Sequence, residues 1–192
     1  MLTDFIIVDD VFDNPDEIVE FAKRQKYYSK EEHKYGEKSY FAGLRSDALN
    51  EIDEELYHNI NNQIFTKCIE KHYPKEFNKI VYGFGFQTST FFHILYENDQ
   101  LTPKWWHKDS NCIWAGVIYL NKNPSPNSGT LVNRNNKEIV VENSYNKLVI
   151  YSPTYEHTSQ GGFGTNIDDG RLTLTFFVNA FQFKIKSVED EE

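Results

Sequence analysis

Hydrophobic residues recur with a helical period in the first third of the chain. Ile18 and Ala22 lie four residues apart, as the apolar positions of one helix face do. Asn14 followed by Pro15 is a common helix start, because asparagine caps free N–H groups and proline fits the first turn. We therefore expect a helix that starts at Asn14 and runs to about Tyr28.

A second helix is predicted over about residues 48–72. Apolar residues recur there at four-residue intervals, namely at Ile52, Leu56, Ile60, Ile64 and Cys68. This spacing places them along one helix face, which we expect to pack against the rest of the protein. Pro74 lacks the N–H group that a helix needs and is predicted to end it.

From about Val81 the pattern changes to short apolar runs separated by turn-forming residues. The strand-like runs are YGFGFQTSTFFHILYEN, NCIWAGVIYLN, EIVVEN, NKLVIYS and GRLTLTFFVNAF, and the clearest turns are KNPSPNSG and SQGGFGTNIDDG. Residues 112–120 are apolar at both alternating sets of positions, so both faces of this strand should be covered. The pattern predicts a mainly β protein (α+β) with helices packed on the outside of a sheet.

The last long strand separates apolar from polar positions. In RLTLTFF, leucine and phenylalanine occupy the even-numbered positions, whereas Arg171, Thr173 and Thr175 occupy odd-numbered ones. Alternate residues of a strand share a face. A buried strand with an arginine and two threonines on its second face is expected to line a polar site, because burying such groups without partners is costly.

Composition fits one globular domain and disfavours several kinds of partner. The 192 residues are enough for one hydrophobic core, and an aromatic content of 16% favours strands. Acidic residues number 29 and basic ones 20, and the net charge of −9 repels nucleic acid and anionic membranes. The apolar run near the N-terminus is too short for a signal peptide or a membrane span. Two cysteines, Cys68 and Cys112, cannot make a disulfide framework and are typical of a cytoplasmic protein.

The motif WWHKDSN contains a candidate pair of metal ligands, His107 and Asp109. Two residues that lie two positions apart on a strand point to the same side and can reach one metal ion. The spacing alone carries little weight, because 6 histidines and 29 acids in 192 residues produce about one such pair by chance. Trp105 and Trp106 either line a substrate entrance here or simply pack beside it.

Two later residues strengthen the metal-site interpretation. His157, in YEHTSQGG, follows a predicted strand and would supply a second imidazole. Two histidines and one carboxylate are the usual protein ligands of non-haem Fe(II), which keeps open positions for a co-substrate and dioxygen. Arg171 follows in the strand described above. A buried arginine needs an anionic partner, and a dicarboxylate co-substrate would provide one.

With these residues the chain resembles the Fe(II)- and 2-oxoglutarate-dependent oxygenases, and within them the prolyl-hydroxylase-like branch. The resemblance rests on HKD, YEHTSQGGFG, RLTLTFF and GVIYLN, which occur in the family's order within about residues 84–183. FIIVDDVFDNPDEIVEFA and YFAGLRS are similar to the helical N-terminal extension of some microbial and phage members. The resemblance implies a double-stranded β-helix, which is a jelly-roll, cupin-like fold. We expect one domain, 1–192, made of a helical extension, 1–80, the oxygenase core, 81–183, and an acidic tail, 184–192.

The resemblance also assigns roles to the candidate site residues. His107, Asp109 and His157 match the family's iron ligands. Arg171 matches the arginine that binds the far carboxylate of 2-oxoglutarate, and Thr173 matches a hydroxyl residue that often assists it. The interval between His157 and Arg171 is longer than usual because of the glycine-containing loop 161–170.

Tyr119 and Tyr96 are further candidates for contacts with the co-substrate. Tyr119 of GVIYLN matches a tyrosine whose phenol reaches the same carboxylate in hypoxia-type prolyl hydroxylases. Tyr96 is a candidate for a second contact.

The function that the resemblance implies is hydroxylation by a 2-oxoglutarate-dependent dioxygenase. Fe(II) is the expected cofactor, 2-oxoglutarate and dioxygen are the expected co-substrates, and ascorbate is a candidate addition. The substrate would be a peptidyl residue such as proline, or a small metabolite, and 2-oxoglutarate would be converted to succinate. The substrate's identity and the oligomeric state are left open.

Related chemistries fit these residues less well. Halogenases of the superfamily lack the carboxylate ligand, which Asp109 provides here. Nucleic-acid demethylases of this fold carry a second arginine six residues after the first, where this chain has Phe177. A zinc hydrolase could use the same three ligands but would not need Arg171 behind them. The remaining alternative is a non-catalytic jelly-roll module that binds a metal or ligand or has a structural role.

Several other polar residues are given structural interpretations. His33, His58 and His72 lie in charged segments and are expected to be solvated, whereas His93 is expected to be a satisfied core residue. Arg45 in AGLRS could bind substrate, but an ion pair with one of the many acids is the favoured interpretation.

Overall fold

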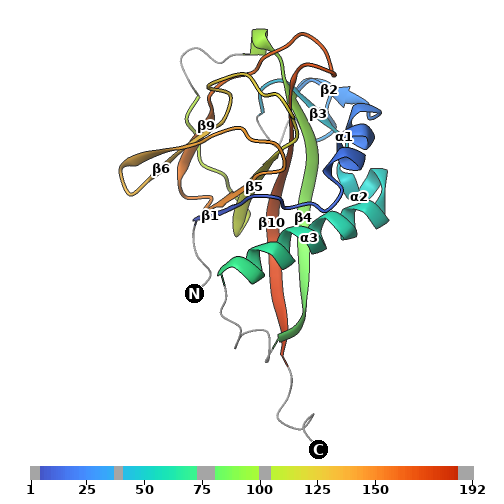
Figure 1. Cartoon of the computed structure of the whole chain (residues 1–192), viewed down its shortest axis with the longest axis vertical. Coiled ribbons are helices and arrows are strands. Elements are labelled where there is room, and N and C mark those ends of the chain that lie inside the picture. The colour runs from blue at the N-terminus through green and yellow to red at the C-terminus, as the bar shows by residue number, and fades with distance from the viewer. Residues whose placement is uncertain (1–4, 37–40, 73–80, 100–104, 186–192) are drawn as a thin grey trace, which may run out of the picture.

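The protein is mainly β, and its strands form two antiparallel sheets that pack on each other (Figure 1). The structure is a computed structural model that describes residues 5–36, 41–72, 81–99 and 105–185, with the backbone alone described at 69–72, 81–84 and 183–185. Within these residues the larger sheet has seven strands and the smaller sheet has three. This arrangement agrees with the double-stranded β-helix expected from the sequence.

The larger sheet has the strand order β1-β8-β5-β10-β4-β3-β2, and the smaller sheet has the order β7-β6-β9. The strands of the larger sheet are β1 (Phe5–Val8), β8 (Leu148–Tyr151), β5 (Trp114–Tyr119), β10 (Arg171–Ile185), β4 (Val81–Leu95), β3 (Leu44–Ser46) and β2 (Tyr27–Tyr28). The strands of the smaller sheet are β7 (Lys137–Val141), β6 (Thr130–Arg134) and β9 (Glu156–Ser159). Thus the predicted helical extension also contributes β1, β2 and β3 to the larger sheet.

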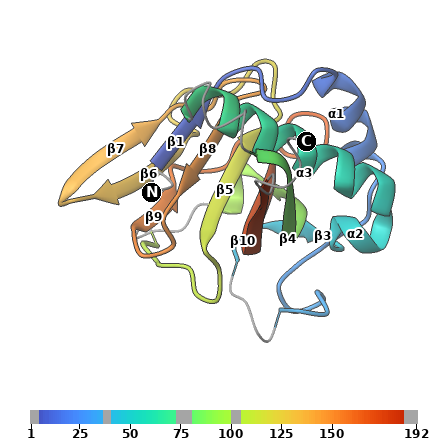
Figure 2. The same cartoon turned by 90° about the horizontal axis from the view of Figure 1, so that it is seen from below.

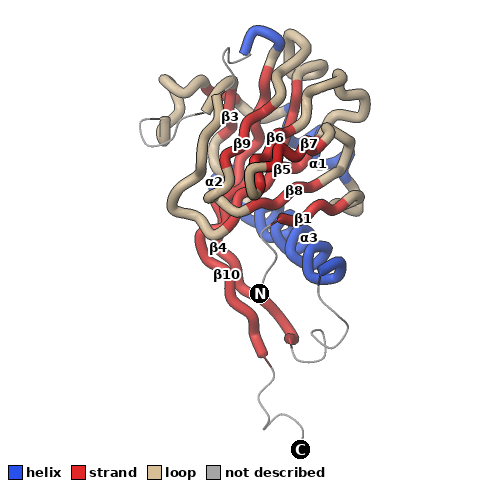
Figure 3. The backbone as a smooth tube through the Cα atoms, turned by 90° about the vertical axis from the view of Figure 1, so that its left-hand side faces the viewer, coloured by secondary structure: helices blue, strands red, loops and turns tan. Residues whose placement is uncertain are grey.

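The helices lie on the face of the larger sheet that points away from the smaller sheet (Figures 2 and 3). They are α1 (Pro15–Lys23), α2 (Leu49–Ile52) and α3 (Glu54–His72), and a short 3-10 helix, η1, spans Glu97–Asp99. Ile60, Ile64 and Cys68 of the predicted stripe are buried against the sheet. None of the helices in the described parts of the chain is both long and apolar enough to cross a membrane.

The first helix is shorter than predicted. It begins at Pro15 but ends at Lys23 rather than near Tyr28. The reason is that the residues Tyr27–Tyr28 leave the helix and pair with β3 as strand β2. A pairing partner so distant in the chain is not visible in the local periodicity.

The second predicted helix is divided in two. Asp53 has extended backbone angles, φ −157° and ψ 101°, which separate α2 from α3. Its carboxylate accepts a hydrogen bond of 2.9 Å from the N–H of Leu56, so it caps the start of a new helix. Pro74, predicted to end this helix, lies outside the described residues, as do residues 186–192 of the predicted acidic tail.

Strand β5 is covered on both faces, as its apolar sequence predicted. Ile118 packs in the core beneath the helices, whereas Ala115, Val117 and Tyr119 pack in the second core between the two sheets. The larger sheet is therefore a middle layer, with helices on one side and the smaller sheet on the other.

One face of the larger sheet carries polar residues in register. Arg45 pairs with His93, His93 with Thr173, and Thr173 with Tyr119, so these four residues form one row across β3, β4, β10 and β5. Neighbouring residues in such a row point to the same side of the sheet. This row lies on the side that faces the smaller sheet, and it positions much of the candidate site.

The pairing of β10 with β4 contains a register shift between Val178 and Ala180. Before the shift, even-numbered side chains such as Phe176 and Val178 point into the core beneath the helices. After it, the odd-numbered Phe181 packs against that core, with its ring 4.8 Å from the ring of Phe65 in α3. The shift is therefore a β-bulge that changes which residues face the helices.

Candidate functional site

The backbone brings three predicted metal ligands together. His107 and His157 form an antiparallel bridge, with N–H to O distances of 3.1 and 2.9 Å in the two directions. The N–H of Asp109 donates to the carbonyl of Pro153 at 3.1 Å, which holds the carboxylate next to the bridge. The ligand atoms of the three side chains all lie within 4.8 Å of one another.

Both imidazoles are oriented by backbone carbonyls. Nδ1 of His157 lies 3.1 Å from the carbonyl of Tyr155, and Nδ1 of His107 lies 3.4 Å from that of Trp105. A carbonyl oxygen only accepts hydrogen bonds, so each Nδ1 carries the hydrogen and each Nε2 presents its lone pair. Carbonyl groups that fix the tautomer of a histidine in this way are a regular feature of metal sites.

The Nε2 atoms and the Asp109 carboxylate face one another. Nε2 of His157 is 3.3 Å from Oδ2 of Asp109, and Nε2 of His107 is 3.9 Å from Oδ1. Oδ2 is buried and has no hydrogen-bond donor within the described residues. Lone pairs that face each other repel, and a cation between them removes the repulsion. The donor set therefore fits a divalent metal ion.

Burial keeps both histidines neutral, which is the form that binds metals. It lowers the pKa of His157 to about 4, although the hydrogen bond to Tyr155 opposes the change. Burial and the nearby His157 lower the pKa of His107 to about 4, against the opposing charge of Asp109. Burial raises the pKa of Asp109, and the charges of His107 and Arg45 act in the opposite direction.

The three side chains open into a cavity of about 680 Å³ between the sheets. Such a volume lies within the range of about 300–1,000 Å³ that is typical of small-molecule sites. Its walls include Arg171, Thr173 and Thr175, the polar face predicted for the last strand. The metal ligands and this polar face therefore belong to the same site.

Arg171 is buried and has no acidic partner among the residues that the structure describes. It is 3% exposed, and its Nε and Nη2 donate to the carbonyls of Ser128 and Gly129 at 2.6 and 3.2 Å. Burial lowers its pKa. Within the described residues no carboxylate forms an ion pair with it, so the guanidinium can receive an anion from the cavity. Thr173 lies next to it on the same face, fully buried, with its hydroxyl donating to the carbonyl of His93 at 3.3 Å.

The two candidate tyrosines are not among the residues that line the cavity. The hydroxyl of Tyr119 donates to the Thr130 hydroxyl at 2.7 Å and lies 3.2 Å from the Val141 carbonyl. The centroid of its ring lies 5.7 Å from the guanidinium carbon of Arg171, so the two side chains pack against each other. Tyr96 packs against the core beneath the helices, because it is one residue beyond Leu95 and so points to the opposite side.

Four other residues can be compared with their predicted environments. His58 is exposed, as expected, but His33 is only 5% exposed and donates from Nε2 to the carbonyl of Ser46 at 2.9 Å. The prediction for His33 was wrong because the pocket around it is built from distant segments.

His93 is half-buried and bonded to the carbonyl of Ala42, and its ring forms part of the cavity wall. Trp105 stacks on His107, with ring centroids 3.9 Å apart and planes at 8°.

Arg45 is a cavity residue that sequence reasoning assigned to an ion pair. Within the described residues it has no such pair, and it lines the cavity with Asp109 nearby. The acids close to it in the sequence bind elsewhere, since Asp47 contacts Tyr28 and Lys34. Its sequence signal was its place in YFAGLRS, a segment similar to the N-terminal extension of some family members, which did not decide between substrate binding and an ion pair.

Comparisons with known proteins support the fold. No family model matches the chain, and no curated protein matches it. Among solved structures, the chain is similar to an oxidoreductase of the 2OG-Fe(II) oxygenase family from Burkholderia pseudomallei, with a TM-score of 0.53, 10% identity, and coverage of 91% of this chain and 84% of that one. A prolyl-4-hydroxylase from Pseudomonas putida gives a TM-score of 0.54, 13% identity, and coverage of 96% and 94%. A structure of prolyl 4-hydroxylases from Phytophthora capsici gives a TM-score of 0.56 and 13% identity, and the match covers 93% of this chain and 61% of that one. The chain therefore has the fold of 2OG-Fe(II) oxygenases and prolyl 4-hydroxylases, as its resemblance to that family implied.

Proposed function

We propose that the protein is a non-haem Fe(II)- and 2-oxoglutarate-dependent dioxygenase that hydroxylates its substrate. His107, Asp109 and His157 would hold the iron, since two neutral imidazoles and a carboxylate converge in the tautomers that metal binding requires. Arg171 would bind the far carboxylate of 2-oxoglutarate, with Thr173 beside it. These assignments follow the resemblance and agree with where the side chains lie.

One observation carries the proposal, namely that the metal cluster shares one cavity with a buried arginine that has no acidic partner in the described part of the chain. A zinc hydrolase would need the three ligands but not a buried receptor for a second carboxylate. Asp109 also occupies the ligand position that halogenases of this superfamily leave open. The geometry therefore favours a diacid co-substrate and hydroxylation as the outcome.

Bound at these ligands, Fe(II) would supply the activation of dioxygen that couples oxidation of 2-oxoglutarate, giving succinate and carbon dioxide, to oxygenation of the substrate. The protein's own residues have simpler tasks. The guanidinium of Arg171 fixes one end of the diacid, and its bonds to Ser128 and Gly129 keep that group in position. The backbone bridge between His107 and His157 keeps the two histidine ligands side by side in the same cavity.

The substrate class follows less directly from the site. A peptidyl residue such as proline agrees with the prolyl 4-hydroxylases among the similar structures, and a small metabolite agrees with the cavity volume of about 680 Å³. A requirement for ascorbate and a cytoplasmic location stay predictions from the sequence.

Metal and co-substrate binding provide the first test. Titrating the Fe(II)-loaded protein anaerobically with 2-oxoglutarate should produce a visible charge-transfer absorption band, and His107→Ala should abolish metal binding and the band together. Arg171→Met should weaken 2-oxoglutarate binding on the order of 100-fold or more, because two charge-assisted hydrogen bonds are lost. Metal affinity should change much less in this variant. The matched control is His58→Ala at an exposed position of α3.

Turnover provides the second test. Succinate release, together with mass spectrometry of a cell extract for the gain of one oxygen, separates a dioxygenase from a non-catalytic module that binds the same ligands. Equal metal binding by the wild type and His107→Ala would refute the proposed site.

A further inference from the structure

A second arginine is buried in the same cavity. Arg45 is the central residue of β3, and its backbone pairs with Tyr28 of β2 and His93 of β4. Its side chain lines the cavity together with Asp109, and the residue is only 7% exposed. Strand pairing therefore fixes the backbone of Arg45, and its side chain points into the cavity.

The guanidinium of Arg45 lies among three aromatic rings. Its central carbon is 4.2 Å from the ring centroid of Phe41, 5.1 Å from that of Phe91 and 6.0 Å from that of Phe177. The faces of aromatic rings stabilise a positive charge. They leave the N–H groups, which lie in the plane of the guanidinium, without oxygen acceptors.

Those N–H groups lack partners in the described part of the protein. Within the described residues, Nε of Arg45 is buried and makes no hydrogen bond. Asp109 is the acid that influences the pKa of Arg45, yet the close contacts of the Asp109 carboxylate are with the imidazoles of His107 and His157. Burial lowers the pKa of Arg45 to about 10, so the group stays charged at neutral pH. Arg171 differs, since two backbone carbonyls accept its hydrogen bonds.

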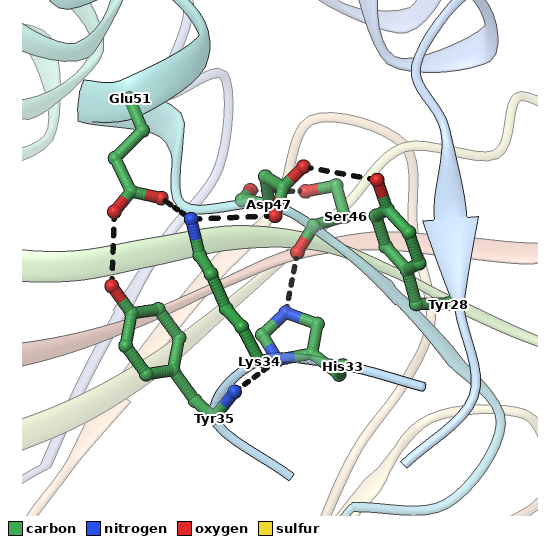
Figure 4. Close-up of polar contacts among 7 residues, drawn as sticks. All are labelled: Tyr28, His33, Lys34, Tyr35, Ser46, Asp47 and Glu51. Carbon is green, nitrogen blue, oxygen red and sulfur yellow. Dashed lines mark hydrogen bonds and ion pairs between the residues drawn. The ribbon is translucent and has the colours of Figure 1, made fainter. Parts of the chain in front are cut away.

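The segment around Arg45 is held rigidly by a polar cluster (Figure 4). Nε2 of His33 bonds to the carbonyl of Ser46, and Nδ1 accepts the N–H of Tyr35 at 3.2 Å. Asp47 receives the hydroxyl of Tyr28 at 3.3 Å and pairs with Lys34 at 3.5 Å. The carboxylate of Glu51 in α2 in turn accepts hydrogen bonds from the ammonium group of Lys34 and the hydroxyl of Tyr35. These contacts immobilise the residues that follow Arg45 in the chain.

His33 also supports the rings beside the guanidinium. Its ring meets Phe41 edge-on at 5.4 Å and Phe91 at 5.9 Å. Thus the backbone, the flanking residues and the ring neighbours of Arg45 are all fixed, while its guanidinium has no hydrogen-bond or ion-pair partner among the described residues. Groups held in place before binding lose little entropy when a ligand arrives, so this arrangement suits a recognition site.

The co-substrate accounts for one arginine but not for two. Arg171 and Arg45 lie on β10 and β3, which are separated by β4, so two strand spacings of about 10 Å in total divide them across the sheet. Arg171 also lies two residues along β10 from Thr173, the residue in register with Arg45. A diacid whose one end chelates the metal has a single remaining carboxylate, and Arg171 would bind it. The substrate is then the remaining source of an anion for Arg45.

We propose that Arg45 binds a carboxylate of the substrate, and that the substrate is a small free acid rather than an internal proline of a polypeptide. This inference rests on the proposed function. A planar carboxylate matches the fork of one guanidinium and balances its single charge. Arg45 is buried and lines the same cavity of about 680 Å³ as the metal ligands, a volume that suits a small molecule.

The test compares matched ligands on the Fe(II)- and 2-oxoglutarate-loaded protein without oxygen. A panel of free amino acids and hydroxy acids is compared by ligand-observed NMR with the corresponding carboxamides, with inorganic phosphate, and with a proline-containing peptide whose termini are blocked. We expect at least one acid to bind more tightly than its amide. Arg45→Met should weaken that binding about 10- to 100-fold, and Arg45→Lys should weaken it less.

A crossed comparison separates this inference from the proposed function. Arg171→Met should affect mainly 2-oxoglutarate affinity, and Arg45→Met mainly the affinity for the acid; thermal unfolding of each variant checks its fold. Equal loss of 2-oxoglutarate affinity in the two variants would overturn the inference, because Arg45 would then belong to the co-substrate site. Tighter binding of phosphate or the blocked peptide, or no preference for any acid over its amide, would overturn it too. If iron and 2-oxoglutarate fail to bind but an acid still requires Arg45, the proposed function falls and the carboxylate site stands.

Discussion

Protonating His93 should lower the stability of the fold, because three positive groups would then share one cavity. His93 lies on β4 next to Arg45 of β3 and Thr173 of β10. Burial and the charge of Arg45, with a smaller effect of Arg171, lower its pKa from 6.5 to about 3. Below pH 6.5 the unfolded chain binds a proton at this residue that the folded protein does not. The stability is therefore complete above pH 6.5 and is lost as the pH falls toward 3.

The size of this effect follows from the difference in pKa. Each pH unit in this window costs about 1.4 kcal/mol, so His93 should account for about 3 kcal/mol of lost stability between pH 6.5 and 4. Urea unfolding of the metal-free protein at several pH values would measure it. His93→Gln keeps an amide donor for the carbonyl of Ala42 but cannot take up a proton, so its stability should fall less steeply than that of the wild type.

The same substitution at the exposed His58 provides the baseline for exchanging histidine for glutamine. Free energies of unfolding that fall in parallel for the wild type and His93→Gln between pH 6.5 and 4 would refute this reasoning.

Three further substitutions test other parts of the structure. Adding Fe(II) at about 1,000 times its dissociation constant should stabilise the protein by about 4 kcal/mol in anaerobic urea unfolding, and His157→Ala should remove the gain. Tyr119→Phe leaves the buried hydroxyl of Thr130 without its donor, so it should cost about 1–3 kcal/mol in urea unfolding. Because Tyr119 does not line the cavity, calorimetry should show nearly unchanged 2-oxoglutarate affinity. Asp53→Ala removes the cap of α3 and should cost about 1 kcal/mol, and an unchanged unfolding midpoint would contradict that role.

The parts of the site that follow local periodicity could be predicted from the sequence. His107 and Asp109 share a side because they are two positions apart, and the alternation in RLTLTFF placed Arg171 and Thr173 on one face. The layering was predictable for the same reason, since strands with one or two apolar faces indicate how a sheet is covered, whereas the double-stranded β-helix itself was implied by the resemblance to the oxygenase family.

The parts that depend on distant segments could not be predicted. The environment of Arg45 consists of Phe41, Phe91 and Phe177, which come from three separate regions of the chain. The early end of α1 has the same origin, because Tyr27–Tyr28 is drawn into a sheet by residues almost twenty positions later. Tyr96 shows a different difficulty, because it directly follows Leu95, which lines the cavity, while its own side chain packs on the opposite side of the sheet.

The bulge in β10 makes one strand serve two environments. Ahead of it, odd-numbered residues such as Arg171 face the cavity, whereas beyond it the odd-numbered Phe181 faces α3. Deleting a single residue there would reverse one half of the strand relative to the other, and would place either Arg171 or Phe181 on the wrong side of the sheet. Insertions and deletions in this strand should therefore be tolerated only in pairs, which makes its length as strict a requirement as the identity of its residues.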